Sequence, residues 1–105
     1  MPRPITQKEI KLIAKEFRVL SQPVRLHLLN ELRKGEQSVT ALVEITGLNQ
    51  ANVSKHLQVL LKNDLVSRER RGQSVFYRIA NPIIFELCEL MCEKMRSYRK
   101  QREPL

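Results

Sequence analysis

One stretch in the middle of the chain carries the side chains best suited to recognise another molecule. Residues 49–65, NQANVSKHLQVLLKNDL, are predicted to form one helix with two different faces. Apolar residues recur there at helical spacing and predict a buried stripe, formed by Val53, Leu57, Leu60 and Leu61. After the cap residue Asn49, the front and outer side carry amide, hydroxyl and ammonium groups, on Gln50, Asn52, Ser54, Lys55 and Gln58.

These polar side chains match the chemistry of DNA. Short amides and hydroxyls donate and accept hydrogen bonds at base edges, and Lys55 can neutralise a phosphate. A surface helix needed only for solubility usually alternates Glu and Lys, yet no acidic residue lies between Asn49 and Asn63. We therefore expect this helix to enter the major groove of double-stranded DNA, with Asn49 among its contacts.

The chain is short and strongly basic. Its 105 residues suffice for a single domain, 1–105, in which residues 1–5 form a loose arm and residues 96–105 a basic tail. Nineteen Lys and Arg against eleven Asp and Glu give a net charge of +8. This charge favours nucleic acid as a partner first and an acidic membrane surface second. A basic protein without a polyanion partner is the alternative.

No targeting or membrane-spanning segment is predicted. No apolar run is long enough to span a bilayer, and the N-terminus lacks a signal-peptide pattern. We therefore expect a cytoplasmic protein with no membrane partner. In that compartment Cys88 and Cys92 should be reduced thiols.

Two helices are predicted in the first third of the chain. Thr6 and Glu9 form a capping-box pattern before a helix that runs to about residue 20. A second helix covers residues 24–34 and ends at Gly35, because glycine commonly forms a left-handed C-cap. This second helix is expected to be buried through Leu26, Leu28, Leu29 and Leu32.

A third helix is predicted to lead into the polar helix through a tight connection. Ser38 caps this helix, which runs to about residue 46 and ends at Gly47. Residues 47–49 then join it to the helix at 49–65, which is the arrangement of a helix-turn-helix. The side chains expected inside are Val39, Leu42, Val43 and Ile45.

Two strands and a turn follow, at residues 66–71 and 74–79. Val75, Tyr77 and Ile79 alternate on one face, and Gly72-Gln73 can turn the chain between the strands. Because basic side chains crowd this hairpin, it suits the minor groove or the flanking phosphates, although a solvated turn is the alternative. The hairpin residues expected to contact DNA are Arg68, Arg70, Arg71 and Gln73.

Together these elements predict a mainly α fold with a small β-hairpin. Four helices, a hairpin and a last helix that begins at Asn81-Pro82 make a winged helix-turn-helix, in which the hairpin is the wing. The basic end of the last helix, residues 94–102, is expected to fray. His56 lies beside the buried stripe, where helix packing is favoured over base recognition.

Three segments of the chain carry a family resemblance: LSQPVRL at residues 20–26, GLNQANVSKHL at 47–57 and RGQSVFY at 71–77. They resemble the ArsR/SmtB family of small dimeric bacterial repressors, which sense metals, arsenicals or thiol chemistry, and the resemblance covers residues 8–95. It implies that the first and last helices form a dimer interface and that residues 68–77 form the wing. It also implies base and phosphate contacts at Gln50, Ala51, Ser54 and Lys55.

The last helix favours a dimer independently of the resemblance, because apolar residues cover most of its girth. These residues are Ile83, Ile84, Phe85, Leu87, Cys88, Leu90, Met91, Cys92 and Met95. One domain of this size can cover only part of such a helix, so a second copy should cover the rest. Two recognition helices would then lie about 34 Å apart on a palindromic operator. Burial wholly within one subunit is the alternative.

The ligand sites that the family resemblance implies do not occur in this sequence. The Cys-Val-Cys-Asp run of the arsenic-sensing version aligns with residues 38–41, Ser-Val-Thr-Ala, and hydroxyls are poor ligands for soft metals. The zinc-sensing version uses Asp and His on the last helix, which has no histidine here.

Cys88 and Cys92 are the remaining candidates for a ligand site. Their spacing places both thiols on one helix face with Cβ atoms about 5 to 6 Å apart, too far for an unstrained disulfide within the helix. Two chains could bring four thiols together, to hold zinc, Cu(I) or a trivalent arsenical, or to form an intersubunit disulfide or polysulfide. Packing as small apolar side chains in a dimer core is the alternative.

The expected function is that of a homodimeric, sequence-specific transcriptional repressor. The alternative is a winged-helix module that binds a protein partner and touches DNA only through charge. An enzyme is not expected, because the sequence offers no nucleophile paired with a base, no phosphate-binding glycine loop and no carboxylate pair in a pocket-like context.

Overall fold

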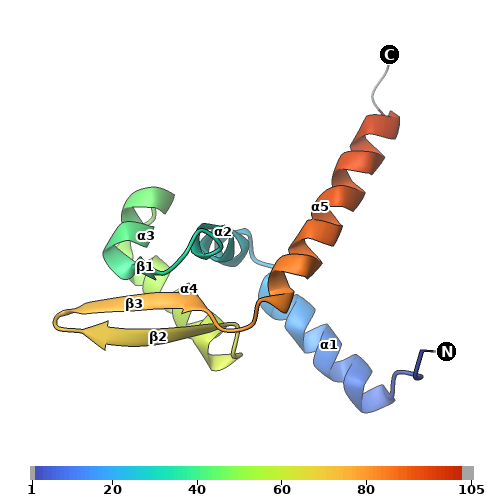
Figure 1. The fold of residues 1–105 in the computed structure, drawn as a ribbon, viewed down its shortest axis with the longest axis horizontal. Coiled ribbons are helices and arrows are strands. Elements are labelled where there is room, and N and C mark those ends of the chain that lie inside the picture. Colours follow the sequence, from blue (N-terminus) through green and yellow to red (C-terminus); the bar gives the residue numbers. More distant parts are fainter. Residues whose placement is uncertain (1, 103–105) are drawn as a thin grey trace.

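The structure is a computed structural model that describes residues 2–102, with the side chains of residues 2–99. Along this part of the chain the elements are α1 (Gln7–Leu20), α2 (Pro23–Leu32), β1 (Gln37–Ser38), α3 (Val39–Thr46), α4 (Gln50–Lys62), β2 (Val66–Arg71), β3 (Ser74–Ile79) and α5 (Ile83–Arg102). Figure 1 shows the hairpin beside α2, α3 and α4, while α1 and α5 project from the opposite end. This arrangement confirms the predicted winged helix-turn-helix.

Local sequence signals explain where most of the helices begin and end. The Thr6 and Glu9 capping box is present, and the Ser38 hydroxyl accepts a hydrogen bond from the backbone N–H of Ala41. Gly47 ends α3 in the left-handed conformation at φ 72°, which a residue with a Cβ adopts only with strain. The Asn81 side chain accepts from the N–H of Ile83 at 3.1 Å and so starts α5.

The predicted end of the second helix was wrong. Helix α2 ends at Leu32, and its C-cap Arg33 keeps a right-handed conformation. Gly35 lies beyond the helix with φ 137°, outside the left-handed cap region, because residues 33–35 turn the chain toward β1. The glycine therefore belongs to the turn and does not cap the helix.

The sheet contains one strand that the sequence did not indicate. Strands β2 and β3 pair antiparallel as expected, and Gly72 takes φ 63° in the turn between them. The two-residue strand β1 adds to the other edge of β3, which gives the order β1-β3-β2. Two residues are too few for the alternation that identifies a strand in a sequence.

The hydrophobic core lies between the helix-turn-helix and the sheet. Five side chains from α2, α3 and α4 are fully buried: Leu28, Leu42, Val53, Leu57 and Leu60. Tyr77 and Val66 close the core from the sheet, at 2% exposure each. Within the described residues, no helix is both long and apolar enough to cross a membrane.

Two residues predicted to be buried are exposed in the single chain. Leu26 is 42% exposed and Ile45 is 46% exposed. Leu26 points toward the apolar surface that α1, α2 and α5 leave open, and Ile45 lies on the outer side of α3, whose inner side buries Leu42. Helical spacing alone does not tell which edge of an apolar face meets the core.

The two ends of the chain differ in regularity. Residues 2–5 have no regular secondary structure, as predicted for the arm, although the Arg3 guanidinium pairs with Glu9 at 2.8 Å. Helix α5 continues to Arg102, and the fraying of residues 94–102 stays a prediction. Most residues there are good helix formers, which favours the helical conformation. Met1 and residues 103–105 of the predicted tail lie outside the described residues.

Candidate nucleic-acid interface

The polar face of α4 lies on the outside of the molecule. Gln50, Ala51, Lys55 and Gln58 are exposed, and Asn52 and Ser54 are half-buried. The stripe beneath them, Val53, Leu57 and Leu60, is fully buried, so α4 cannot rotate without exposing its apolar side. The structure thus presents the predicted recognition residues of α4 together, on one acid-free surface.

Two of these side chains already have hydrogen-bond partners. The Asn49 side chain accepts from the N–H of Asn52 at 2.7 Å and caps α4, so this oxygen is engaged in the helix. The Gln58 amide donates to the Tyr77 hydroxyl at 3.5 Å, which links α4 to the wing. Gln50, Ser54 and Lys55 are therefore the more available contacts.

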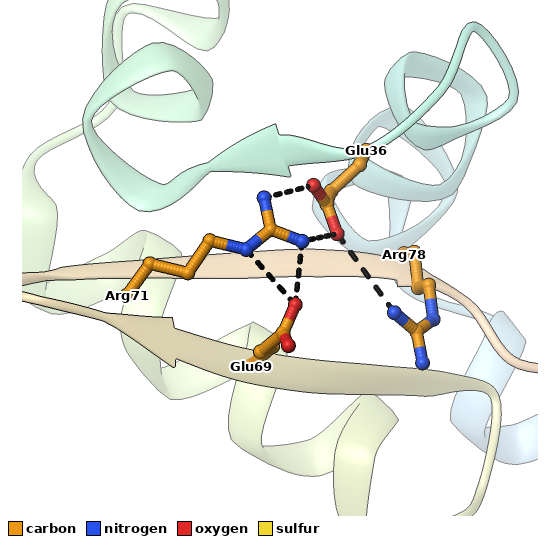
Figure 2. Close-up of polar contacts among 4 residues, drawn as sticks. All are labelled: Glu36, Glu69, Arg71 and Arg78. Carbon is orange, nitrogen blue, oxygen red and sulfur yellow. Dashed lines mark hydrogen bonds and ion pairs between the residues drawn. The ribbon is translucent and has the colours of Figure 1, made fainter.

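The wing arginines fall into two groups. Arg68 and Arg70 are exposed and have neither a hydrogen bond nor an ion pair within the described residues. Arg71 is held by Glu36 and Glu69, as Figure 2 shows, and these hydrogen bonds raise the pKa of its guanidinium. Gln73 is exposed at the turn. Only part of the predicted wing set is thus free for a ligand.

A polar link beneath α4 was not foreseen from the sequence. The Arg25 Nε donates to His56 Nδ1 at 3.2 Å, and its Nη1 donates to the carbonyl oxygen of Val19 at 3.0 Å. One guanidinium therefore joins the end of α1, helix α2 and the recognition helix. The signal in the sequence is an arginine that interrupts the apolar run of α2.

The Arg25 link requires a neutral His56, because Nδ1 must accept a hydrogen bond. Burial of the imidazole lowers the pKa of His56, and the positive charges of Arg25 and Lys55 lower it further. His56 is half-buried at the edge of the core, where the sequence had placed it.

Cys88 and Cys92 lie at a different place, beside a cavity of about 640 Å³ between α1, α2 and α5. Phe17, Phe85 and Arg33 also line it. Burial raises the pKa of the Cys88 thiol, the neighbouring Cys92 adds to this, and the Arg33 guanidinium opposes it. Among the described residues there is no cluster of three or more His, Cys, Asp or Glu side chains that could hold a metal.

Comparisons with known proteins agree with this architecture. A family model described as "Bacterial regulatory protein, arsR family" matches residues 22–68, from α2 into the wing. The regulator NmtR of Mycobacterium tuberculosis is 33% identical over 86 residues, which are 82% of this chain and 72% of that protein. A "Probable mercury resistance operon repressor" of Streptomyces lividans is 36% identical over 77 residues. That match spans 73% of this chain and only 62% of the Streptomyces protein.

A solved structure extends the comparison to the whole fold. The homodimeric winged helix-turn-helix DNA-binding domain of Mb0332 from Mycobacterium bovis superposes with a TM-score of 0.79 at 28% sequence identity. The match covers 100% of this chain and 99% of that one. The chain described here belongs to the arsR family of bacterial regulatory proteins, and its fold is the winged helix-turn-helix.

The neutral state of His56 makes stability depend on pH. The folded pKa lies below the ordinary value of 6.5, so the unfolded chain takes up this proton first as the pH falls. The stability that neutral His56 contributes is therefore fully present above about pH 6.5. It is lost as the pH falls toward the lower pKa of the folded state. We expect the free energy of unfolding to decrease between about pH 7 and pH 5 less steeply in His56→Asn than in the wild type. Chemical denaturation at several pH values measures this difference, and equal slopes would contradict it.

Proposed function

We propose that this protein is a homodimeric, sequence-specific DNA-binding transcriptional repressor. The observation that carries the proposal is the exposed, acid-free face of α4, held outward by its fully buried stripe. Exposed Arg68 and Arg70 on the adjacent wing add positive charge beside this face. The names of the relatives, which are repressors and HTH-type regulators, support the same function.

The exposed groups divide into those that read bases and those that bind phosphates. Gln50 and Ser54 donate and accept hydrogen bonds at base edges in the major groove, and Lys55 pairs with a phosphate. The N-terminal end of α4 carries the positive end of the helix dipole, which favours binding of the same DNA. Arg68 and Arg70 serve the minor groove or the backbone beside it, where affinity depends strongly on salt.

A second copy of the chain would cover the apolar surface that α1 and α5 leave exposed. Among the described residues, six large apolar side chains on α1 and α5 are at least half exposed: Ile10, Leu12, Phe17, Ile83, Leu90 and Met95. An apolar surface of this kind marks an interaction site, and the Mycobacterium bovis neighbour is homodimeric. Dimerisation through α1 and α5 would place two copies of α4 about one turn of DNA apart, on a palindromic operator.

Cys88 and Cys92 are the proposed sensor of this repressor, with a soft metal ion or a trivalent arsenical as ligand. One chain supplies two thiols, so a site of four needs the α5 helices of both subunits. The raised pKa of Cys88 leaves its thiol protonated, so a thiolate-binding metal must displace the proton. A protonated thiol is also oxidised less readily than a thiolate. We therefore place a disulfide or polysulfide second, after a metal or arsenical, as the species that the cysteines would form.

The first test addresses sequence readout. The double variant Ser54→Ala, Lys55→Ala should bind a duplex from its own promoter about 10- to 100-fold more weakly, because it loses a base contact and a phosphate contact. Lys62→Ala is the control, since Lys62 is exposed at the far end of the same helix. Fluorescence anisotropy at physiological salt gives the dissociation constants. Equal affinity of the wild type for the promoter and a scrambled duplex would favour the protein-binding module instead.

The second test addresses the dimer. Leu90→Glu buries a charge in the proposed interface, so this variant should sediment as a monomer at concentrations where the wild type is a dimer. Ile45→Glu is the matched control, because Ile45 is also an exposed apolar residue but lies on α3. A wild type that sediments as a monomer would show that the apolar faces of α1 and α5 have another partner.

The third test addresses the thiols. Arsenite, zinc or Cu(I) should release the wild-type dimer from DNA, and Cys88→Ser and Cys92→Ser should each abolish this release, because hydroxyls bind soft metals poorly. An organic persulfide is titrated in parallel to detect thiol oxidation. If no reagent changes the DNA affinity of the wild type, the cysteines serve packing only.

A further inference from the structure

The two faces of the β2–β3 hairpin carry different arginines. In an antiparallel pair, residues directly opposite each other share a face. Arg68 pairs with Tyr77 and Arg70 with Val75, so both arginines lie on the face that Tyr77 buries against α4. Arg71 pairs with Ser74, and Glu69 pairs with Phe76, so Arg71 lies on the opposite face.

Arg71 is bound on that opposite face by two acidic side chains. Its Nη1 and Nη2 donate to the two carboxylate oxygens of Glu36 at 2.6 and 2.9 Å, in a forked arrangement. Its Nε donates to Glu69 at 2.9 Å, and the guanidinium lies over the Phe76 ring at 4.7 Å from the centroid. The donors and the flat face of Arg71 are thus engaged within the protein.

The partner Glu36 lies outside the hairpin. It immediately precedes β1, which continues directly into α3, the first helix of the helix-turn-helix. The Arg78 Nη1 approaches the same carboxylate at 3.9 Å, so the cluster drawn in Figure 2 holds two positive and two negative side chains. The cluster has no excess positive charge to offer a phosphate, and it connects the wing to the start of α3.

We infer that Arg71 is a positioning residue, which together with Glu36 holds the wing at a set angle to the helix-turn-helix, and that the wing contacts DNA through Arg70 and Arg68. The inference rests on the proposed DNA-binding function. A forked guanidinium–carboxylate pair resists rotation, and the Phe76 ring restricts it further. The wing therefore keeps the two unpartnered arginines on the side of α4.

Salt dependence separates a positioning residue from a phosphate contact. Each phosphate contact adds about one to the slope of log affinity against log salt concentration. Arg70→Ala removes one phosphate contact from each subunit of the proposed dimer, so it should lower the affinity and also reduce the slope by about two. Arg71→Ala should lower the affinity about three- to tenfold while the slope stays unchanged, because no phosphate contact is lost. A fall of about two in the slope for Arg71→Ala, or no loss of affinity, would overturn the inference.

A double-mutant cycle with Glu36 tests whether the two residues act as one unit. Glu36→Ala should weaken DNA binding as Arg71→Ala does, and the double variant should be no weaker than either single variant. If Glu36 merely masked Arg71 from DNA, Glu36→Ala would instead strengthen binding and steepen the salt dependence.

Amide hydrogen exchange of the free protein keeps the inference testable without DNA. Arg71→Ala and Glu36→Ala should speed exchange in β2 and β3, whereas Arg70→Ala should not. Unchanged exchange in Arg71→Ala would overturn the inference even if the wild type binds its promoter. Failure of the wild type to bind any duplex specifically would count against the proposed function alone, since the exchange result stands independently.

Discussion

The burial of one stripe of α4 is the constraint on which the rest of the structure depends. Val53, Leu57 and Leu60 are fully buried against side chains of α2 and α3. A helix buried along one stripe must present its opposite face outward, and burying three such side chains stabilises this orientation by several kcal/mol, on the order of 1.5–3 each. The recognition face is thus held outward, and Gln50, Ala51, Lys55 and Gln58 on it remain exposed.

Polar links then set the positions of the elements around that core. Arg25 joins α1, α2 and α4, Gln58 joins α4 to the sheet, and Arg71 joins the wing to the start of α3. Hydrophobic contacts are not directional, whereas these hydrogen bonds require particular orientations. Among the described residues, no buried side-chain nitrogen or oxygen lacks a partner, so the links carry little desolvation cost.

The side chains proposed to contact DNA and the exposed apolar surface lie in different parts of the molecule. Helix α4 and the wing lie toward one side of the molecule, and α1 and α5 lie toward the other (Figure 1). The acid-free face and the free arginines belong to the first group, and most of the exposed large apolar side chains belong to α1 and α5. The thiols of Cys88 and Cys92 line a cavity at the apolar end. Helix α2 takes part in both places, because Leu26 and Leu29 line the cavity and Arg25 donates a hydrogen bond to His56 of α4.

Local patterns in the sequence determined most of the fold: the caps at Thr6, Ser38 and Asn49, both hairpin strands and the polar face of α4. These features depend on neighbours a few residues away, so periodicity and capping chemistry predict them. Only the tertiary structure decided the strand β1, the exposure of Leu26 and the pairing of Arg71 with Glu36, which lies 35 residues away. Such contacts arise when distant segments of the chain meet in space. The local sequence around an arginine is the same whether its guanidinium binds a carboxylate of the protein or a phosphate of DNA.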